Sequence, residues 1–245
     1  MRSHTLRQPA VFKVVMTVGV LLLVAAPAAA FQLQPMSASI DPQSGTSTTT
    51  FDVLNTTDAP IAVQMRVTTR RIEPDGTELN EDASDQLQLF PSQVILRPEQ
   101  TQTVRVRWLG DGVPDEELPF RVVAEQLPVN LGRDQDEASG VRMMLRYRAT
   151  LYVRPEGAAP DVSVTDLSVG ESEISMTVEN RGTAHALLAD GLLVLRTGSE
   201  ETEIPAEEVE ALATVNVLPG GVRRVRVPRA DLPGEPDEIS FRFAR

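Results

Sequence analysis

The sequence contains no cysteine, and this absence excludes disulfide bonds and every reaction that needs a thiolate. Lys13 is the only lysine, so no later residue can supply a lysine amine for a Schiff base or an anion site. Histidine occurs twice, and only His185 lies beyond the first thirty residues. One histidine without cysteine does not make any of the familiar zinc ligand sets, so we expect no metal site and no cofactor.

Motifs for catalysis are also missing. No GxSxG turn accompanies His185, and a lone histidine between small apolar residues is more often structural than catalytic. Acidic residues are plentiful, but they gather in loops such as 80–85 and 132–137, where their spacing differs from that of an EF-hand calcium loop. We therefore expect that the protein is not an enzyme.

A long apolar run occurs once, at 14–26. It follows the basic residues Arg2, Arg7 and Lys13 and is followed by three alanines at 28–30. This is the layout of a cleavable signal peptide, and the run is short for a membrane span. We predict cleavage near Ala30 and an exported mature chain that does not insert into the membrane. An uncleaved N-terminal anchor is the alternative.

The predicted mature chain is strongly acidic. It holds 20 arginines against 35 acidic residues, which gives a net charge of −15. Nucleic acid is therefore excluded as an expected partner, because phosphate binding needs a basic surface. The charge favours solubility and attraction to basic partners.

What remains is a series of short segments with alternating apolar and polar residues, separated by turn residues. In the first half these segments lie at 37–41, 47–55, 61–74, 94–108, 119–129 and 141–154. A second series follows the proline-rich stretch 155–160. This pattern predicts an all-β fold of two tandem sandwiches. The expected boundaries are a signal peptide at 1–30, an N-terminal domain at 31–155 and a C-terminal domain at 156–245.

The segment 141–154, VRMMLRYRATLYVR, is long for a strand. Its apolar set contains Val141, Met143, Leu145 and Tyr147, and its other set is rich in arginine. Alternation with a period of two places these sets on opposite faces. The residues alone allow two interpretations: a strand of the protein's own core, or a strand presented to a partner.

The order of the segments resembles the periplasmic pilus chaperones of the chaperone–usher pathway, the PapD-like family, and within it the archaic branch. The resemblance covers about 38 to 160 and extends to the C-terminal half only as a pattern. Its pieces are FDVLNTTDAPIAVQMRV, ILRPEQTQTVRVRW, PDEELPFRVVAEQLPV and RMMLRYRATLYVRPEGAAPD. It implies two tandem immunoglobulin-like β-sandwich domains in a boomerang arrangement, without enzymatic activity.

The resemblance also implies a function. A chaperone of this family lends a strand to an incomplete pilin-like subunit and delivers the subunit to an outer-membrane usher. The strand would be 141–154, and the side chains that enter the subunit would be those of Val141, Met143, Leu145 and Tyr147. The alternatives are a secreted structural or adhesive component of a surface assembly, and a sandwich that binds or hydrolyses sugars.

Classical members of the family hold the carboxylate at the subunit's C-terminus with an arginine on the first strand and a lysine near the end of the donor strand. The corresponding positions here are Ser37 and 150–152, and neither supplies a basic residue. Arginine binds carboxylates in a bidentate manner, so other arginines are the anchor candidates. These candidates are Arg105, Arg107, Arg146 and Arg148. The resemblance further implies a charged set between the domains, formed by Glu117, Arg154 and Asp231.

Overall fold

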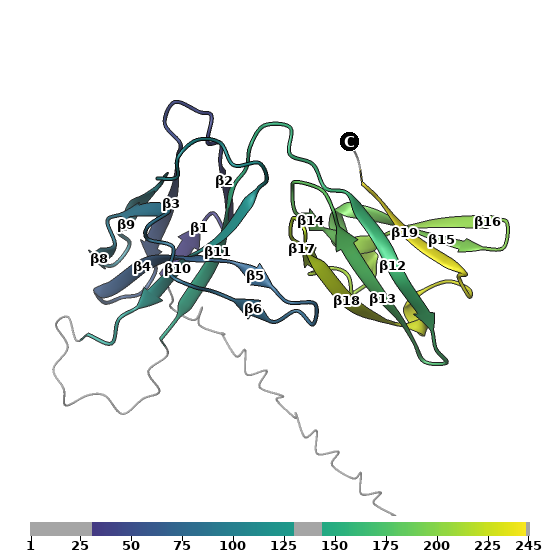
Figure 1. Cartoon of the computed structure of the whole chain (residues 1–245). Helices are drawn as coiled ribbons and strands as arrows, with labels where there is room; N and C mark the ends of the chain where they lie inside the picture. Colours follow the sequence, from purple (N-terminus) through teal and green to yellow (C-terminus); the bar gives the residue numbers. More distant parts are fainter. Residues whose placement is uncertain (1–30, 130–143, 244–245) are drawn as a thin grey trace, which may run out of the picture.

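The computed structural model describes residues 31–129 and 144–243 (Figure 1). Strands and short 3-10 turns make up the regular structure of this part of the chain. Two immunoglobulin-like β-sandwiches follow one another and are set at an angle, so the predicted fold class is confirmed. Within the described ranges, no helix has the length and apolarity needed to cross a membrane.

The N-terminal sandwich has two sheets. The first has the strand order β1-β3-β9-β7, and the second has the order β2-β11-β10-β4-β8. Strands of the first sheet are β1 (Phe31–Gln34), β3 (Thr48–Asn55), β9 (Thr101–Trp108) and β7 (Leu87–Phe90). Those of the second are β2 (Ser37–Ile40), β11 (Arg146–Val153), β10 (Leu118–Gln126), β4 (Ile61–Thr69) and β8 (Gln93–Leu96).

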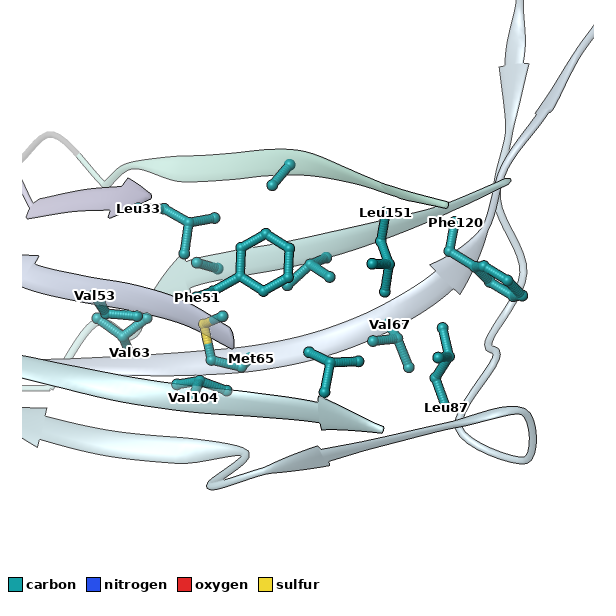
Figure 2. Packing of buried hydrophobic residues seen from close by; sticks show 14 of the residues in the cluster. Leu33, Phe51, Val53, Val63, Met65, Val67, Leu87, Val104, Phe120 and Leu151 are labelled. Atoms are coloured by element: carbon teal, nitrogen blue, oxygen red, sulfur yellow. The ribbon is translucent and has the colours of Figure 1, made fainter. Parts of the chain in front are cut away.

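The core of this sandwich lies between the two sheets. Figure 2 shows Phe51 of β3, Met65 of β4 and Leu151 of β11 pointing into the same interior. Phe51 and Leu151 are fully buried, and burying each such side chain contributes about 1.5–3 kcal/mol. Alternate residues of each strand supply this core, so the residues between them form the outer faces of the two sheets.

The C-terminal sandwich has a core of its own, which includes Ile174, Val178, Leu193 and Leu212. One sheet has the order β12-β13-β18, another β16-β15-β19, and β14 pairs with β17. The bounds are β12 (Val162–Val169), β13 (Glu173–Asn180), β18 (Val222–Pro228), β16 (Glu200–Pro205), β15 (Gly191–Thr197), β19 (Glu238–Phe243), β14 (Ala186–Leu187) and β17 (Asn216–Val217).

The two sandwiches share a local device. Asn55 ends β3 and donates from Nδ2 to the carbonyl of Ala59 at 2.9 Å. Asn180 ends β13 and donates in the same way to the carbonyl of Ala184 at 2.8 Å. Both asparagines are fully buried, and each donates to a second carbonyl from another part of its domain. A buried amide is stable only when its donors are satisfied, so each asparagine fixes the loop that follows its strand.

Two predicted strands are interrupted in the structure. The segment 94–108 forms β8 and β9, which belong to different sheets and are separated by a turn at 97–100. The segment 61–74 ends as β4 at Thr69 and continues into a hairpin of β5 (Arg71–Ile72) and β6 (Glu78–Leu79). The alternation of apolar and polar residues continues through both segments, so the sequence pattern does not reveal where either strand ends.

The β5–β6 hairpin reaches from the first sandwich to the second (Figure 1). At its tip, the carbonyl of Pro74 accepts a hydrogen bond of 2.7 Å from the backbone N–H of Arg224 on β18. At its base, the backbone N–H of Arg70 donates to the carbonyl of Pro119 at 3.1 Å. The hairpin is thus attached to both domains.

Candidate functional site

Strand β11 has one edge that is only partly covered. Its first edge pairs with β10 over its whole length, from Arg146 to Val153. Its second edge pairs with β2 only from Thr150 to Val153. The first described segment, 31–40, explains this, because it crosses between the sheets: β1 pairs with β3, and only β2 reaches β11. Within the described ranges, no strand covers the second edge of β11 from Arg146 to Ala149.

The backbone groups on this open edge can be assigned. The N–H of Thr150 donates to the carbonyl of Met36, on the β2 side, at 2.9 Å. The carbonyl of Leu145 accepts from Gln126, on the β10 side, at 3.0 Å. Since the direction alternates along a strand, the peptide groups of Arg146 and Arg148 point to the open edge. No described residue forms a backbone hydrogen bond with them on that edge.

The outward side chains of β11 lie in rows with the side chains in register with them on the neighbouring strands. Ser37, Thr150, Arg121 and Thr68 lie side by side on β2, β11, β10 and β4. Nη1 of Arg121 donates to Oγ1 of Thr150 at 2.5 Å. The guanidinium of Arg121 therefore lies beside Thr150, in the row of side chains that begins with Ser37.

Glu78, from the β5–β6 hairpin, lies against three arginines. Its Oε1 accepts from Nε of Arg121 at 2.9 Å and from Nη2 of Arg148 at 2.6 Å. Its Oε2 accepts from Nη2 of Arg121 at 2.6 Å and from Nε of Arg70 at 3.1 Å. The four donors saturate the carboxylate, and Arg121 binds it in the bidentate manner. We call Glu78, Arg70, Arg121 and Arg148 the arginine cluster.

The arginine cluster is partly buried. The side chains of Arg70, Arg121 and Glu78 are exposed by 8%, 16% and 16%, whereas that of Arg148 is exposed by 44%. Burial by itself raises the pKa of Glu78, but the hydrogen bonds and charges of Arg121 and Arg70 outweigh burial and hold this pKa at about 2. Glu78 is therefore a carboxylate at neutral pH, and three guanidinium groups face one negative charge.

Beside the arginine cluster, the outer face of the sheet is hollowed. A depression of about 210 Å³ is lined by Arg66, Thr68, Asn80, Arg146 and Arg148, together with Val123. Glu125 pairs with Arg146 and lies 3.6 Å from Arg66, so this part of the face also carries more positive than negative charge. Such a surface is suited to a carboxylate.

The domains meet at a second charged group. Glu117 is buried, and its Oε1 lies 2.6 Å from Nδ1 of His185 and accepts a hydrogen bond of 3.1 Å from the backbone N–H of the same residue. Its Oε2 faces Nε of Arg154 at 3.7 Å. The ring of His185 also stacks on Tyr152, with centroids 3.9 Å apart. His185 thus connects the C-terminal domain to β11 and to the segment before β10.

Comparison with known proteins was made by sequence and by structure. The family model of the pili and flagellar-assembly chaperone, PapD N-terminal domain, matches residues 32–159, which is more than half of the chain. The chain belongs to this family. The curated proteins contain no match to the sequence.

Solved structures of pilus chaperones resemble most of the chain, including both sandwiches. The class 5 fimbriae chaperone CfaA aligns with a TM-score of 0.56 at 13% identity, over 87% of this chain and 98% of the other. The CsuC–CsuE chaperone–subunit complex of archaic Csu pili of Acinetobacter baumannii aligns at 0.55 and 16%, over 80% and 89%. The SafB–SafA chaperone–pilin complex of Salmonella enterica aligns at 0.53 and 17%, over 84% and 87%. At these identities the likeness supports the shared fold.

With the family established, the residues expected to enter the subunit can be placed. Leu145 and Tyr147 are half-buried and pack against the core of the chaperone's own N-terminal sandwich. The ring of Tyr147 meets that of Phe31 edge to face, with centroids 4.9 Å apart. Val141 and Met143 lie outside the described residues. In the described part, the apolar face of the strand belongs to the chaperone itself, and the edge of the strand is what it leaves open.

The structure does not bring the four candidate anchor arginines of the chaperone together. Arg146 and Arg148 lie on the outer face of the sheet that contains β11. Arg105 and Arg107 lie on β9, in the opposite sheet, and point away from the core on the other side of the sandwich. Arg121, Arg70 and Glu78 were missed by the sequence interpretation. The signal for Arg121 was an arginine inside the apolar strand FRVVAE, whereas nothing marked Glu78.

The expected interdomain set also differs in its third member. Glu117 and Arg154 face each other as described above, but the residue of the C-terminal domain that contacts Glu117 is His185. Asp231 is exposed at the end of the short 3-10 turn that follows β18. The sequence interpretation gave His185 a structural role without assigning it a partner. No group of His, Asp and Glu in the described ranges is arranged to hold a metal ion.

Proposed function

We propose that this chaperone acts in the periplasm, binds a pilin-like subunit by adding strand β11 to the subunit's sheet, and delivers the subunit to an outer-membrane usher. The open edge of β11 from Arg146 to Ala149 is the observation that carries this proposal. An open strand edge presents unpaired N–H and C=O groups, and a subunit that lacks a strand has unpaired N–H and C=O groups beside the gap in its own sheet. Main-chain hydrogen bonds between them would satisfy both.

The open edge leads directly towards 141–145, where the sequence places Val141 and Met143 in the alternating apolar set. We propose that these two side chains enter the subunit, because Leu145 and Tyr147 are already engaged with the chaperone's own core. Methionine is flexible and polarizable, which suits a donor that has to fit several subunits.

For the carboxylate at the subunit's C-terminus, we propose the arginine cluster and the adjoining depression as the anchor. Arg148 belongs to the arginine cluster and also lines the depression, and its guanidinium is accessible. Arg121 lies beneath it, beside Thr150 and Ser37. This assignment keeps the location expected for the family while supplying the charge from a neighbouring strand.

For the usher, we propose the outer face of the other sheet. Arg105 and Arg107 project from β9 without a hydrogen bond or ion pair to any described residue. With Phe90, which is 74% exposed, they border a depression of about 640 Å³. This surface lies on the opposite side of the sandwich from the arginine cluster, so both partners could be bound at once.

A backbone substitution tests the strand addition. Arg146→Pro removes an N–H that points to the open edge and leaves the bonds between β11 and β10 in place, because proline is tolerated at such edge positions. Arg146→Ala is the matched control: it removes the same guanidinium, which lines the proposed anchor depression, but keeps the N–H, so the difference between the two variants measures the N–H alone. Co-expression with a pilin-like subunit, followed by co-purification, should yield complex with the Ala variant and much less with the Pro variant. Equal yields from two variants that melt like the wild type would contradict the proposal.

A further inference from the structure

The arginine cluster already contains a carboxylate of the protein itself. All three N–H-bearing nitrogens of Arg121 are engaged, with Nε and Nη2 on Glu78 and Nη1 on Thr150. The pair of donors at Nε and Nη2 of Arg121 is therefore occupied, and a second carboxylate can take that pair only by displacing Glu78. Arg148 is the accessible member, and it too is bonded to Glu78.

The carboxylate of Glu78 lies on a short hairpin that is held by few backbone hydrogen bonds. Glu78 belongs to the β5–β6 hairpin, whose two strands have only two residues each. The hairpin pairs through two register partners, Arg71 with Leu79 and Ile72 with Glu78. Short, largely exposed elements with few backbone bonds have low local stability and open before the core does.

The same hairpin touches the second domain. Its Pro74 carbonyl accepts from the backbone N–H of Arg224 at 2.7 Å, and the guanidinium of Arg223 lies next to Gly76 at the tip. Asp75 is also at the tip and has a favourable charge interaction with Arg223. Whatever moves Glu78 therefore acts on a contact between the domains.

We propose that Glu78 is a resident occupant of the subunit anchor: in the free chaperone it holds Arg121 and Arg148, and a partner's terminal carboxylate takes these arginines by displacing it, which loosens the hairpin from β18. This inference rests on the proposed function, because it assumes that the arginine cluster receives a carboxylate. Its consequence is that, in a chaperone without subunit, the anchor arginines stay paired with Glu78 and the hairpin stays in contact with β18. Release of the hairpin then reports that a carboxylate is bound.

The proposal predicts how removal of the occupant changes carboxylate binding. The probe is an N-acetylated tripeptide with a free C-terminal carboxylate, with its C-terminal amide as the comparison. If the anchor is free in about a tenth of the molecules, Glu78→Gln should strengthen binding of the acid ~10-fold. It should leave binding of the amide unchanged. Glu73→Gln is the matched control, because Glu73 lies on the same hairpin and pairs with Arg71 outside the arginine cluster.

Binding is measured by NMR titration of the arginine Nε–Hε signals. Hydrogen exchange at the Arg224 amide reports the hairpin contact, and it should speed up when the acid binds to the wild type. In Glu78→Gln it should be fast before any addition. Glu78→Asp keeps the charge on a shorter side chain, so it should bind the acid with intermediate affinity, and it serves if the Gln variant does not fold.

The outcomes are distinct. If Glu78→Gln binds the acid as the wild type does, or more weakly, Glu78 is part of the anchor's scaffold and the proposal is overturned. If Arg224 exchange does not respond to the acid in the wild type, the coupling to the second domain is overturned. Both results are independent of strand addition, which is tested by the Arg146 variants. If neither protein distinguishes acid from amide while subunit binding persists, the anchor lies elsewhere and the proposal fails with it.

Discussion

Arg121 and Thr150 are joined by a hydrogen bond of 2.5 Å from the guanidinium to the hydroxyl, between neighbouring strands. Thr150 is in register with Ser37 on its other side. Ser37 and residues 150–152 supply no basic residue, so the proposed anchor takes its charge from the guanidinium of Arg121 on β10.

This relationship predicts the effect of removing Arg121. Arg121→Gln should lower subunit affinity by ~30-fold or more, because truncating one partner of a desolvated charge pair typically costs about 2–5 kcal/mol. Arg71→Gln is the control, since Arg71 is 72% exposed and pairs only with Glu73 among the described residues. Affinity is measured by competition for a pre-formed chaperone–subunit complex. Wild-type affinity in a folded Arg121→Gln protein would remove Arg121 from the anchor.

The pKa of Glu78 predicts a pH dependence of stability. Because this pKa falls from 4.5 in the unfolded chain to about 2 in the fold, its contribution is complete above pH 4.5 and is lost as pH falls through about 2. The difference in melting temperature between wild type and Glu78→Gln should therefore be largest above pH 5. It should shrink steadily towards pH 2. A difference that is constant over this range, as measured by differential scanning fluorimetry, would show that the ion pairs do not stabilise the fold.

The sequence was sufficient to predict the fold class and most strands of the N-terminal domain. Phe51, Val53, Val104 and Val106 alternate with polar residues, and in the structure they are buried as this alternation requires. The division of 94–108 between two sheets was not predictable in this way. A strand that leaves one sheet for the other keeps the same apolar period, since both sheets bury their side chains in the same core.

The contact between Glu117 and His185 predicts a loss of stability on truncation. His185→Ala should lower the free energy of unfolding by about 1–3 kcal/mol, because it leaves a buried carboxylate without its hydrogen-bonded ring. His185→Gln should cost less, since an amide N–H can still donate. Glu116→Gln is the control, because Glu116 is the exposed neighbour of the buried Glu117. Urea titration measures the free energy of unfolding of each variant. Equal stability of all three would show that this contact does not hold the domains together.

The site was harder to predict than the fold, for a physical reason. Arg148 and Glu78 are 70 residues apart in the chain, and they meet because a two-residue hairpin folds back over the sheet. Periodicity assigns a residue to a face, but it does not say which distant charge reaches that face. Arg105 and Arg107 illustrate the same limit, since their strand was recognised but the sheet to which it belongs was not.

The outer face of β9 provides a test of delivery that is separate from subunit binding. Arg105→Glu and Arg107→Glu reverse two charges that have no acidic partner in the described part of the chain, so the fold should tolerate them. The variants should co-purify with subunit as well as the wild type does but should bind an usher's periplasmic domain more weakly, by ~10-fold or more. Arg97→Glu is the control on the turn before β9. If all three variants bind the usher like the wild type, this face is not the docking surface.

The last prediction separates the donor role of 141–154 from its role in the core. Leu151 is fully buried, so Leu151→Asp should unfold the chaperone, at a cost above about 4 kcal/mol. Leu145 is half-buried against the same core, so Leu145→Asp should lower the melting temperature as well as weaken subunit binding. Met143 is the informative position, because the sequence places it in the apolar set beyond the described strand.

Met143→Asp should leave melting unchanged and abolish complex formation, since in the complex its charge would enter an apolar groove without a partner. Met144→Asp is the matched control: Met144 is 59% exposed and belongs to the opposite set, so the same charge one residue along should preserve both properties. Melting and co-purification have to be measured on the same preparations. If Met143→Asp collapses melting as Leu151→Asp does, Met143 belongs to the core and the donor assignment is wrong. If Met143→Asp and Met144→Asp bind subunit equally well, the strand edge holds the subunit without a side chain at 143.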